Sequence, residues 1–185
     1  MSGFVMFLLG VAATLGAAAA GARYVGFMAQ RPEDYRSEQV FDIRAELNGP
    51  ILCEGVIYGP LGGVTSRFVG DFAARWVGNR CVMEERFRYD SGNTQDREWS
   101  LSLGNDGTIR ADAPDLVGGG EGRQEGNAVL LRYRIRLPQS AGGHVLAVTD
   151  WMYLTPNGTI INRSQFRKFG IKVAELVATM RKVPA

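Results

Sequence analysis

From residue 51 onward the chain alternates hydrophobic and polar positions with a period of two, which predicts β-strands. The clearest case is the stretch 129–137, where hydrophobic residues alternate with Arg132, Arg134 and Arg136. Such a strand turns one apolar face to a core and one polar face to solvent. The pattern predicts strands near residues 51–58, 67–76, 81–89, 97–103, 107–113, 129–137, 144–154 and 158–167.

Turn-forming residues separate these segments. The stretches 90–92 (DSG), 104–107 (GNDG) and 155–158 (TPNG) carry residues that tolerate a positive φ or preset a turn. The segment 116–127 (LVGGGEGRQEGN) is expected to be one long flexible connection. The last segment, 170–182, fits either a strand or a short helix, and a closing strand is favoured.

This arrangement predicts an all-β fold of about eight to nine antiparallel strands in sequential hairpins. A chain of this kind protects its edge strands best by closing into a lipocalin-like, up-and-down β-barrel. The lumen of such a barrel is either filled by side chains or holds one small ligand.

The segments before residue 51 do not follow this pattern. The sequence FDIRAELNGP (41–50) predicts a short helical turn that Asp42 caps, that Asn48 and Gly49 end, and that Pro50 prevents from continuing. Residues 1–22 are interpreted as a signal peptide or membrane anchor helix, residues 23–40 as a linker and residues 41–182 as the barrel domain.

Residues 3–22 contain no charge, and 20 apolar residues are enough for a helix to cross a bilayer. Small residues at 18–22 offer cleavage sites for a secretory signal peptide. The absence of Lys or Arg before the apolar run favours an uncleaved anchor instead. Either alternative places the domain in the bacterial envelope, at the inner membrane with a periplasmic barrel, or in the periplasm after cleavage. Residues 3–22 would then be the membrane contact.

Composition narrows the function. The net charge of +2 is too small to indicate nucleic-acid binding. One histidine, His144, and two cysteines, Cys53 and Cys81, are too few for a typical zinc site, and no cofactor or metal is expected. The cysteines are either one disulfide or two buried thiols. No nucleophile elbow or phosphate loop occurs, so enzymatic activity is not expected.

Several stretches together form a recognisable set: FDIRAELNGP (41–50), Glu85 with RFRYDSGNTQDREW (86–99), Gly126-Asn127, DWMYL (150–154), INRSQFRKFGI (161–171) and MRK (180–182). In these stretches the chain resembles a family of bacterial envelope proteins, DUF3833. The resemblance covers roughly residues 41–182 and implies a lipocalin-like fold and an envelope location. Many family members look like lipoproteins, whereas this chain has no cysteine for a lipid anchor. The resemblance implies no activity.

Two charged residues, Glu85 and Arg97, share the inward face of their predicted strands. A three-residue loop at 90–92, with Gly92 in the left-handed conformation, sets Glu85 directly opposite Arg97. Opposed side chains lie about 5 Å apart at Cβ, so the two charges are expected to meet. Asp150 shares the inward parity of its own strand. The group is either a polar pin that fixes strand register or a site for the polar head of a ligand.

The leading interpretation is therefore an envelope protein that binds a lipid or other amphipathic molecule in the lumen. The alternative is a structural or assembly protein with a filled barrel and a membrane-protein partner, whose identity the sequence does not give. The candidate ligand-binding residues are Glu85, Arg97, Asp150, Phe87, Trp99, Tyr133, Met152, Phe72 and Trp76.

The strand at 150–154 is hydrophobic on both sides. Trp151 and Tyr153 alternate with Met152 and Leu154, so one of the two sides needs a cover outside the core. Residues 24–47 or the C-terminal segment are expected to supply it. The alternative is that this side contacts the membrane interface, where Trp and Tyr are favoured.

Overall fold

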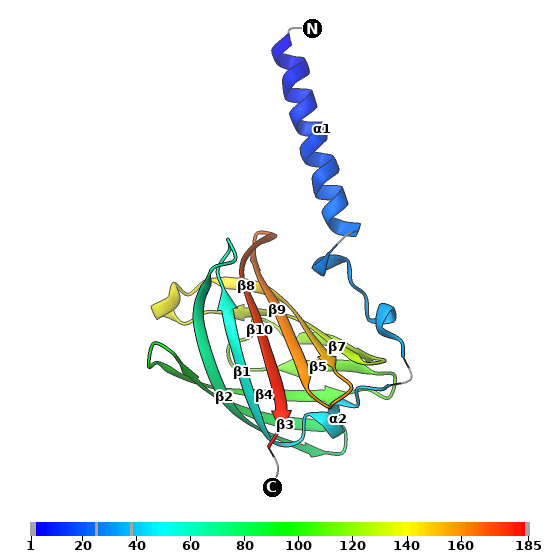
Figure 1. Ribbon diagram of the computed structural model, residues 1–185, viewed down its shortest axis with the longest axis vertical. Coiled ribbons are helices and arrows are strands. Elements are labelled where there is room, and N and C mark those ends of the chain that lie inside the picture. The colour runs from blue at the N-terminus through cyan, green and yellow to red at the C-terminus, as the bar shows by residue number, and fades with distance from the viewer. Residues whose placement is uncertain (1–2, 25, 38, 184–185) are drawn as a thin grey trace.

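The computed structural model describes residues 3–24, 26–37 and 39–183. Ten antiparallel strands form a closed barrel (Figure 1). The strands are β1 (Gly49–Tyr58), β2 (Val64–Val77), β3 (Arg80–Tyr89), β4 (Thr94–Leu103), β5 (Thr108–Asp112), β6 (Gly120–Glu125), β7 (Ala128–Arg136), β8 (Val145–Leu154), β9 (Ile160–Lys168) and β10 (Ile171–Lys182). A short 3-10 helix, η3 (Gln139–Ala141), lies between β7 and β8.

Each strand pairs with its neighbours in the chain, and β1 pairs with β10 to complete the ring. The predicted all-β, antiparallel, up-and-down barrel is therefore confirmed, and the final segment is a strand. The predicted count of eight to nine strands was too low. The additional strand is β6, in the stretch that was expected to be a flexible connection.

Glycines conceal β6 from the alternation pattern. Gly120 and Gly122 occupy the positions where hydrophobic side chains would point inward. A Cβ atom on Gly122 would lie 2.3 Å from the carbonyl oxygen of Leu130 and 2.4 Å from the side chain of Leu131. Side chains of the neighbouring strand β7 fill this space instead, so β6 carries no hydrophobic signal of its own.

One end of the barrel is closed by the short helix α2 (Ile43–Glu46). The Asp42 side chain accepts a hydrogen bond from the Arg44 backbone N–H, which confirms the predicted N-cap. Ile43 and Leu47 are buried in the barrel core, and Trp76 Nε1 donates to the Leu47 carbonyl oxygen at 2.7 Å. This contact fixes the helix as a plug.

The N-terminal region begins with α1 (Gly3–Tyr24), which extends away from the barrel (Figure 1). Residues 1–2 of the predicted leader or anchor, and residues 25 and 38 of the predicted linker, lie outside the described residues. The side chains of α1 are described at residues 3–18 and 21. Among the described residues, no helix has both the length and the apolar character needed to cross a membrane.

The predicted linker contains two 3-10 helices, η1 (Phe27–Ala29) and η2 (Pro32–Tyr35). Phe27 is buried with Trp151, and the Tyr35 ring centroid lies 5.2 Å from that of Trp151. Gln30 Oε1 accepts a hydrogen bond from the Tyr153 hydroxyl at 2.6 Å. The outer face of β8 is thus covered by residues 27–35, as the two-sided hydrophobic pattern predicted.

Candidate functional site

The barrel encloses a cavity of about 580 Å³. It extends from the α2 plug, at Ile43 and Leu47, towards the opposite end, where Ile57, Leu137 and Phe166 form the mouth. Its wall is mainly hydrophobic, with one cluster of polar side chains. The polar lining residues are Glu85, Tyr89, Gln95, Arg97, Asp115, Tyr133, Arg136, Asp150, Asn162 and Ser164.

The structure brings together nearly all of the candidate ligand-binding residues that were predicted from the sequence. Of the nine candidates, the cavity is lined by Glu85, Arg97, Asp150, Phe87, Trp99, Tyr133, Met152 and Phe72. Trp76 does not line it. Trp76 follows the inward parity of β2, but it lies at the end of the strand beside α2, where its indole binds Leu47.

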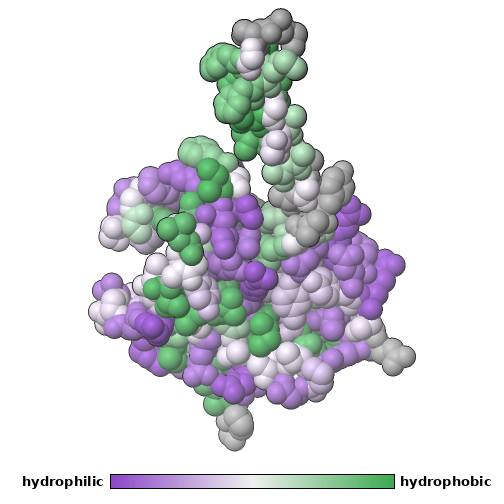
Figure 2. Space-filling view, turned by 45° about the horizontal axis from the view of Figure 1, so that its top comes forward, coloured by the Kyte–Doolittle hydropathy of each residue, from purple (hydrophilic) through white to green (hydrophobic). Residues whose placement is uncertain are grey.

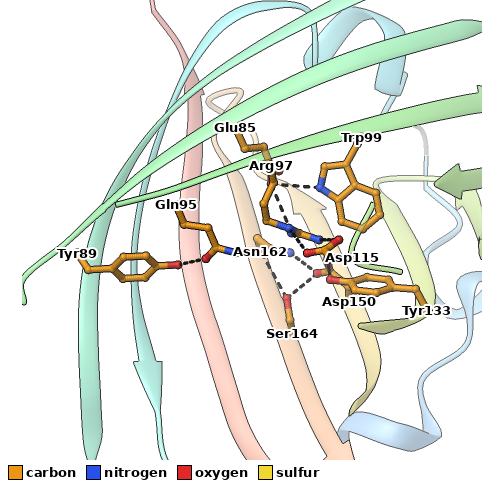
Figure 3. A network of polar contacts seen from close by, with 10 residues as sticks. All are labelled: Glu85, Tyr89, Gln95, Arg97, Trp99, Asp115, Tyr133, Asp150, Asn162 and Ser164. Atoms are coloured by element: carbon orange, nitrogen blue, oxygen red, sulfur yellow. Dashed lines mark hydrogen bonds and ion pairs between the residues drawn. The ribbon is translucent and has the colours of Figure 1, made fainter. Parts of the chain in front are cut away.

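Glu85 on β3 lies directly opposite Arg97 on β4, and the predicted register is confirmed. Gly92 has a φ of 85°, as the three-residue loop required. Glu85 Oε2 lies 3.5 Å from Arg97 Nη1 and accepts a hydrogen bond from Trp99 Nε1 at 3.1 Å (Figure 3). Burial raises the pKa of Glu85 to about 7, although the Arg97 charge and the Trp99 hydrogen bond oppose this shift. Glu85 therefore exchanges a proton near neutral pH.

Arg97 makes its stronger contacts with Asp115, in the connection between β5 and β6. Arg97 Nε and Nη2 donate to the two Asp115 oxygens at 2.8 and 3.1 Å, a bidentate pair. The guanidinium also lies 4.7 Å from the Trp99 ring centroid. Burial disfavours the Arg97 cation, but the hydrogen bonds to Asp115 and the charge of Glu85 outweigh this and raise its pKa. Arg97 therefore stays charged.

The Arg97–Asp115 pair bridges a seam in the barrel wall. β5 pairs only with residues 100–103 of β4, because β5 is five residues long. The chain after β5 runs along β7 instead, through an isolated bridge between Leu116 and Ile135. Arg97 lies before the residues of β4 that pair with β5, and its ion pair with Asp115 links this part of β4 to the connection. A side-chain contact thus takes the place of backbone hydrogen bonds at this point of the wall.

Asp150 on β8 is the centre of a second set of hydrogen bonds. Asp150 Oδ1 accepts from Ser164 Oγ at 2.7 Å and from Asn162 Nδ2 at 2.5 Å, while the Tyr133 hydroxyl lies 3.5 Å from Oδ2 (Figure 3). Burial raises the pKa of Asp150, against the lowering effect of these hydrogen bonds. Burial likewise raises the pKa of Tyr133, so this phenol remains protonated.

A third contact lies nearer the mouth. The Tyr89 hydroxyl donates to Gln95 Oε1 at 2.9 Å, between β3 and β4. The deep polar cluster consists of Glu85, Arg97, Asp115, Tyr133, Asp150, Asn162 and Ser164. Polar groups thus continue from this cluster towards the mouth along β3 and β4.

Sequence reasoning missed part of this site. Asn162 and Ser164 lie between the inward-facing Ile160 and Phe166, so their parity carried the same signal that identified Glu85. Asp115 carried no such signal, because it lies outside the strands and reaches the lumen through the path of a connection.

Within the described residues, no group of three or more His, Cys, Asp or Glu side chains could hold a metal ion. Cys53 lines the cavity and Cys81 lies elsewhere in the core. Both are buried free thiols, which selects one of the two predicted alternatives. Burial raises the pKa of Cys53, so the thiol is a poor nucleophile.

Comparisons with known proteins agree with this architecture. The model of a family described as protein of unknown function (DUF3833) matches residues 22–182, and the chain belongs to that family. The resemblance in the sequence is therefore confirmed, and the barrel is consistent with a lipocalin-like description. No curated protein sequence matches the chain.

Two solved structures are similar to the chain to different degrees. The S-type phycobiliprotein lyase CPES from Guillardia theta is similar over 84% of this chain and 99% of the lyase, with a TM-score of 0.58 and 9% identity. A redesigned β-barrel, mFAP0, bound to DFHBI, is similar over 74% of this chain and 99% of its own, with a TM-score of 0.40 and 11% identity. At this identity, the likeness to the lyase concerns the fold alone.

Proposed function

We propose that this DUF3833 protein binds an amphipathic small molecule, such as a lipid, in the lumen of its barrel and does not act as an enzyme. The observation that carries the proposal is the cavity of about 580 Å³ between the α2 plug and the mouth. Sites for small molecules typically have volumes of about 300–1,000 Å³, apolar walls and a few convergent polar groups. This lumen has all three properties.

The arrangement of large side chains favours a binding site over a filled barrel. Phe72, Trp99, Tyr133 and Met152 are buried, yet they line the cavity and leave its centre free. The polar cluster lines the same cavity. A polar cluster that only fixed the strand register would not need a cavity beside it, since protein interiors are normally filled to high density.

We also propose that the barrel mouth contacts a membrane in the cell envelope, with the barrel on the periplasmic side of the inner membrane. α1 has no charged residue between 3 and 22, and its described hydrophobic side chains are exposed. Figure 2 shows this apolar helix rising from a barrel whose visible outer face is mostly polar.

The hairpin tips at the mouth support the same orientation. Leu61 between β1 and β2 is 99% exposed, and Phe169 between β9 and β10 is 95% exposed. These two tips lie at the end of the barrel from which α1 extends (Figure 1). Phe169 also has a φ of 51°, a conformation rarely adopted by bulky residues and often retained where it serves a function. A ligand leaving the bilayer would then enter the lumen directly.

The test is mass spectrometry of a solvent extract from the full-length protein, purified from its native envelope. We expect a defined small molecule in near-stoichiometric amount that is absent from an unrelated membrane protein purified alongside. An extract that matches this control would overturn the proposal and favour an assembly role with a protein partner.

A further inference from the structure

We infer that the deep polar cluster receives the cationic or N–H-donating end of the ligand, such as a protonated amine on an apolar body. This inference rests on the proposed binding function and specifies its ligand class. It starts from the charges that line the lumen (Figure 3).

The cluster contains more acidic than basic groups. Three carboxyl groups, those of Glu85, Asp115 and Asp150, face the cavity together with the guanidinium of Arg97. Arg136 also lines the cavity, but its side chain is exposed near the mouth. A buried carboxylate without a compensating positive charge is costly. The cluster is therefore complementary to a positive charge that enters with a ligand.

Arg97 is already engaged and is poorly placed to bind an anionic head group. Asp115 occupies its Nε and Nη2 donors, Glu85 lies against Nη1, and one face of the guanidinium stacks on Trp99. An incoming carboxylate or phosphate would compete with Asp115 for the guanidinium and would add negative charge beside Glu85.

The carboxyl groups, by contrast, retain free acceptor positions. Within the described residues, the hydrogen bonds to Glu85 both go to Oε2, which leaves Oε1 for a ligand. The strong hydrogen bonds to Asp150 go to Oδ1, while Oδ2 has the Tyr133 hydroxyl at 3.5 Å. A carboxylate offers about four acceptor sites. Each of these groups can therefore accept an N–H donor from the lumen.

Protonation of the carboxyl groups links the binding of a cation to pH. Glu85 interacts electrostatically with these titratable and charged groups: Arg97, Asp115, Asp150, Tyr133, Tyr89 and Cys53. Burial favours the neutral form of Glu85, whose pKa is about 7, and of Asp150. A bound cation would favour the ionised forms, so binding should release protons to solvent.

The test compares four probes on the full chain, held in solution by an amphipathic polymer, with tryptophan fluorescence as the readout. The probes are dodecylamine, dodecanol, dodecanoate and a lauroyl lysophosphatidylethanolamine, all below their critical micelle concentrations. At pH 8 we expect dodecylamine to bind at least tenfold more tightly than dodecanol and dodecanoate. Lowering the pH to 6 should weaken dodecylamine binding several-fold and leave dodecanol binding unchanged.

The lysolipid probe distinguishes an amine on a lipid head group from a free amine as the natural ligand. Affinity equal to that of dodecylamine assigns the site to an amine on a lipid head group, and weaker binding assigns it to a free amine. Glu85→Gln should lower the affinity for dodecylamine about tenfold without changing that for dodecanol. Glu84→Gln, the exposed neighbour on the same strand, should change neither.

Two results would contradict the inference while leaving the binding function intact. These are dodecanoate binding as tightly as dodecylamine, and a pH-independent affinity for dodecylamine in the wild-type protein. The second needs no variant, so a misfolded Glu85→Gln protein would not prevent the test. A complete absence of saturable binding by all four probes would instead reject the proposed binding function.

Discussion

Glu85 and Arg97 form a directly opposed pair on β3 and β4, inside a barrel whose cavity wall is mainly hydrophobic. Their atoms Oε2 and Nη1 lie 3.5 Å apart, while Arg97 forms a closer bidentate pair with Asp115. The guanidinium is thus shared between a strand partner and a connection. This sharing links the stability of the barrel wall to the chemistry of the lumen.

The first prediction concerns the pH dependence of stability. Glu85 has a pKa of about 7 when folded against an ordinary value of 4.5, so the folded state binds the proton more tightly. Its contribution is present below pH 4.5 and is lost as the pH rises through 7. At about 1.4 kcal/mol per pKa unit, the loss is roughly 3 kcal/mol. Chemical denaturation of Glu85→Gln and wild type between pH 4.5 and 8 should show wild type losing stability relative to the variant. Parallel pH profiles of the two proteins would contradict this.

The second prediction concerns the ion pairs of Arg97. Arg97→Met leaves Glu85 and Asp115 without their cation, and breaking a buried pair costs about 3–5 kcal/mol. We expect a loss near the lower end, because the Asp115 side chain is 26% exposed and can be solvated. Combining Arg97→Met with Glu85→Gln should recover part of this loss, as measured by a double-mutant cycle in urea. Strict additivity of the two substitutions would show that the pair is not coupled.

The third prediction concerns access to the lumen. Ile57 on β1 lines the cavity near its mouth and is only half-buried. Ile57→Trp should therefore fill the entrance with at most a modest loss of stability, and the co-purified molecule should disappear from the extract. Val56→Trp, the neighbouring position that does not line the cavity, is the matched control and should retain the molecule. Equal retention by both variants would place the ligand outside the lumen.

The fourth prediction concerns the orientation of the barrel at a membrane. Leu61 lies at the mouth and Val77 at the opposite end, and both side chains are strongly exposed. With nitroxide labels at Leu61→Cys or Val77→Cys in the full chain on phosphatidylethanolamine–phosphatidylglycerol vesicles, oxygen should relax the Leu61 label more strongly. A water-soluble nickel complex should relax the Val77 label more strongly. Identical profiles at the two sites would argue against a mouth that contacts lipid.

Much of this fold was predictable because hydrophobic alternation marks most of the strands, whereas β10 also fitted a short helix and β6 gave no signal. β6 was not predicted because Gly120 and Gly122 carry no side chain and therefore give no hydrophobic signal. Leu131 and Tyr133 on β7 fill the space beside these glycines. The Glu85–Arg97 contact was predictable because the turn at Gly92 fixes the register. No local pattern could have located Asp115, since its position depends on how the connection between β5 and β6 crosses the wall.

The sequence does not show whether the lumen of the barrel is filled or hollow. Parity shows which side chains point inward, but not whether they meet in the middle. Trp76 shares the parity of Phe72, yet the α2 plug draws its indole to Leu47 and away from the cavity. Whether a barrel is filled or hollow depends on its diameter and on what enters its ends, which are properties of the closed structure.

The most direct measurement is a crystal structure of the protein purified from its native envelope, with difference electron density calculated in the lumen. We expect continuous density that begins at the mouth beside Ile57 and ends at the carboxyl groups of Glu85 and Asp150. A lumen that contains only isolated water peaks, or that collapses around its side chains, would contradict the binding function.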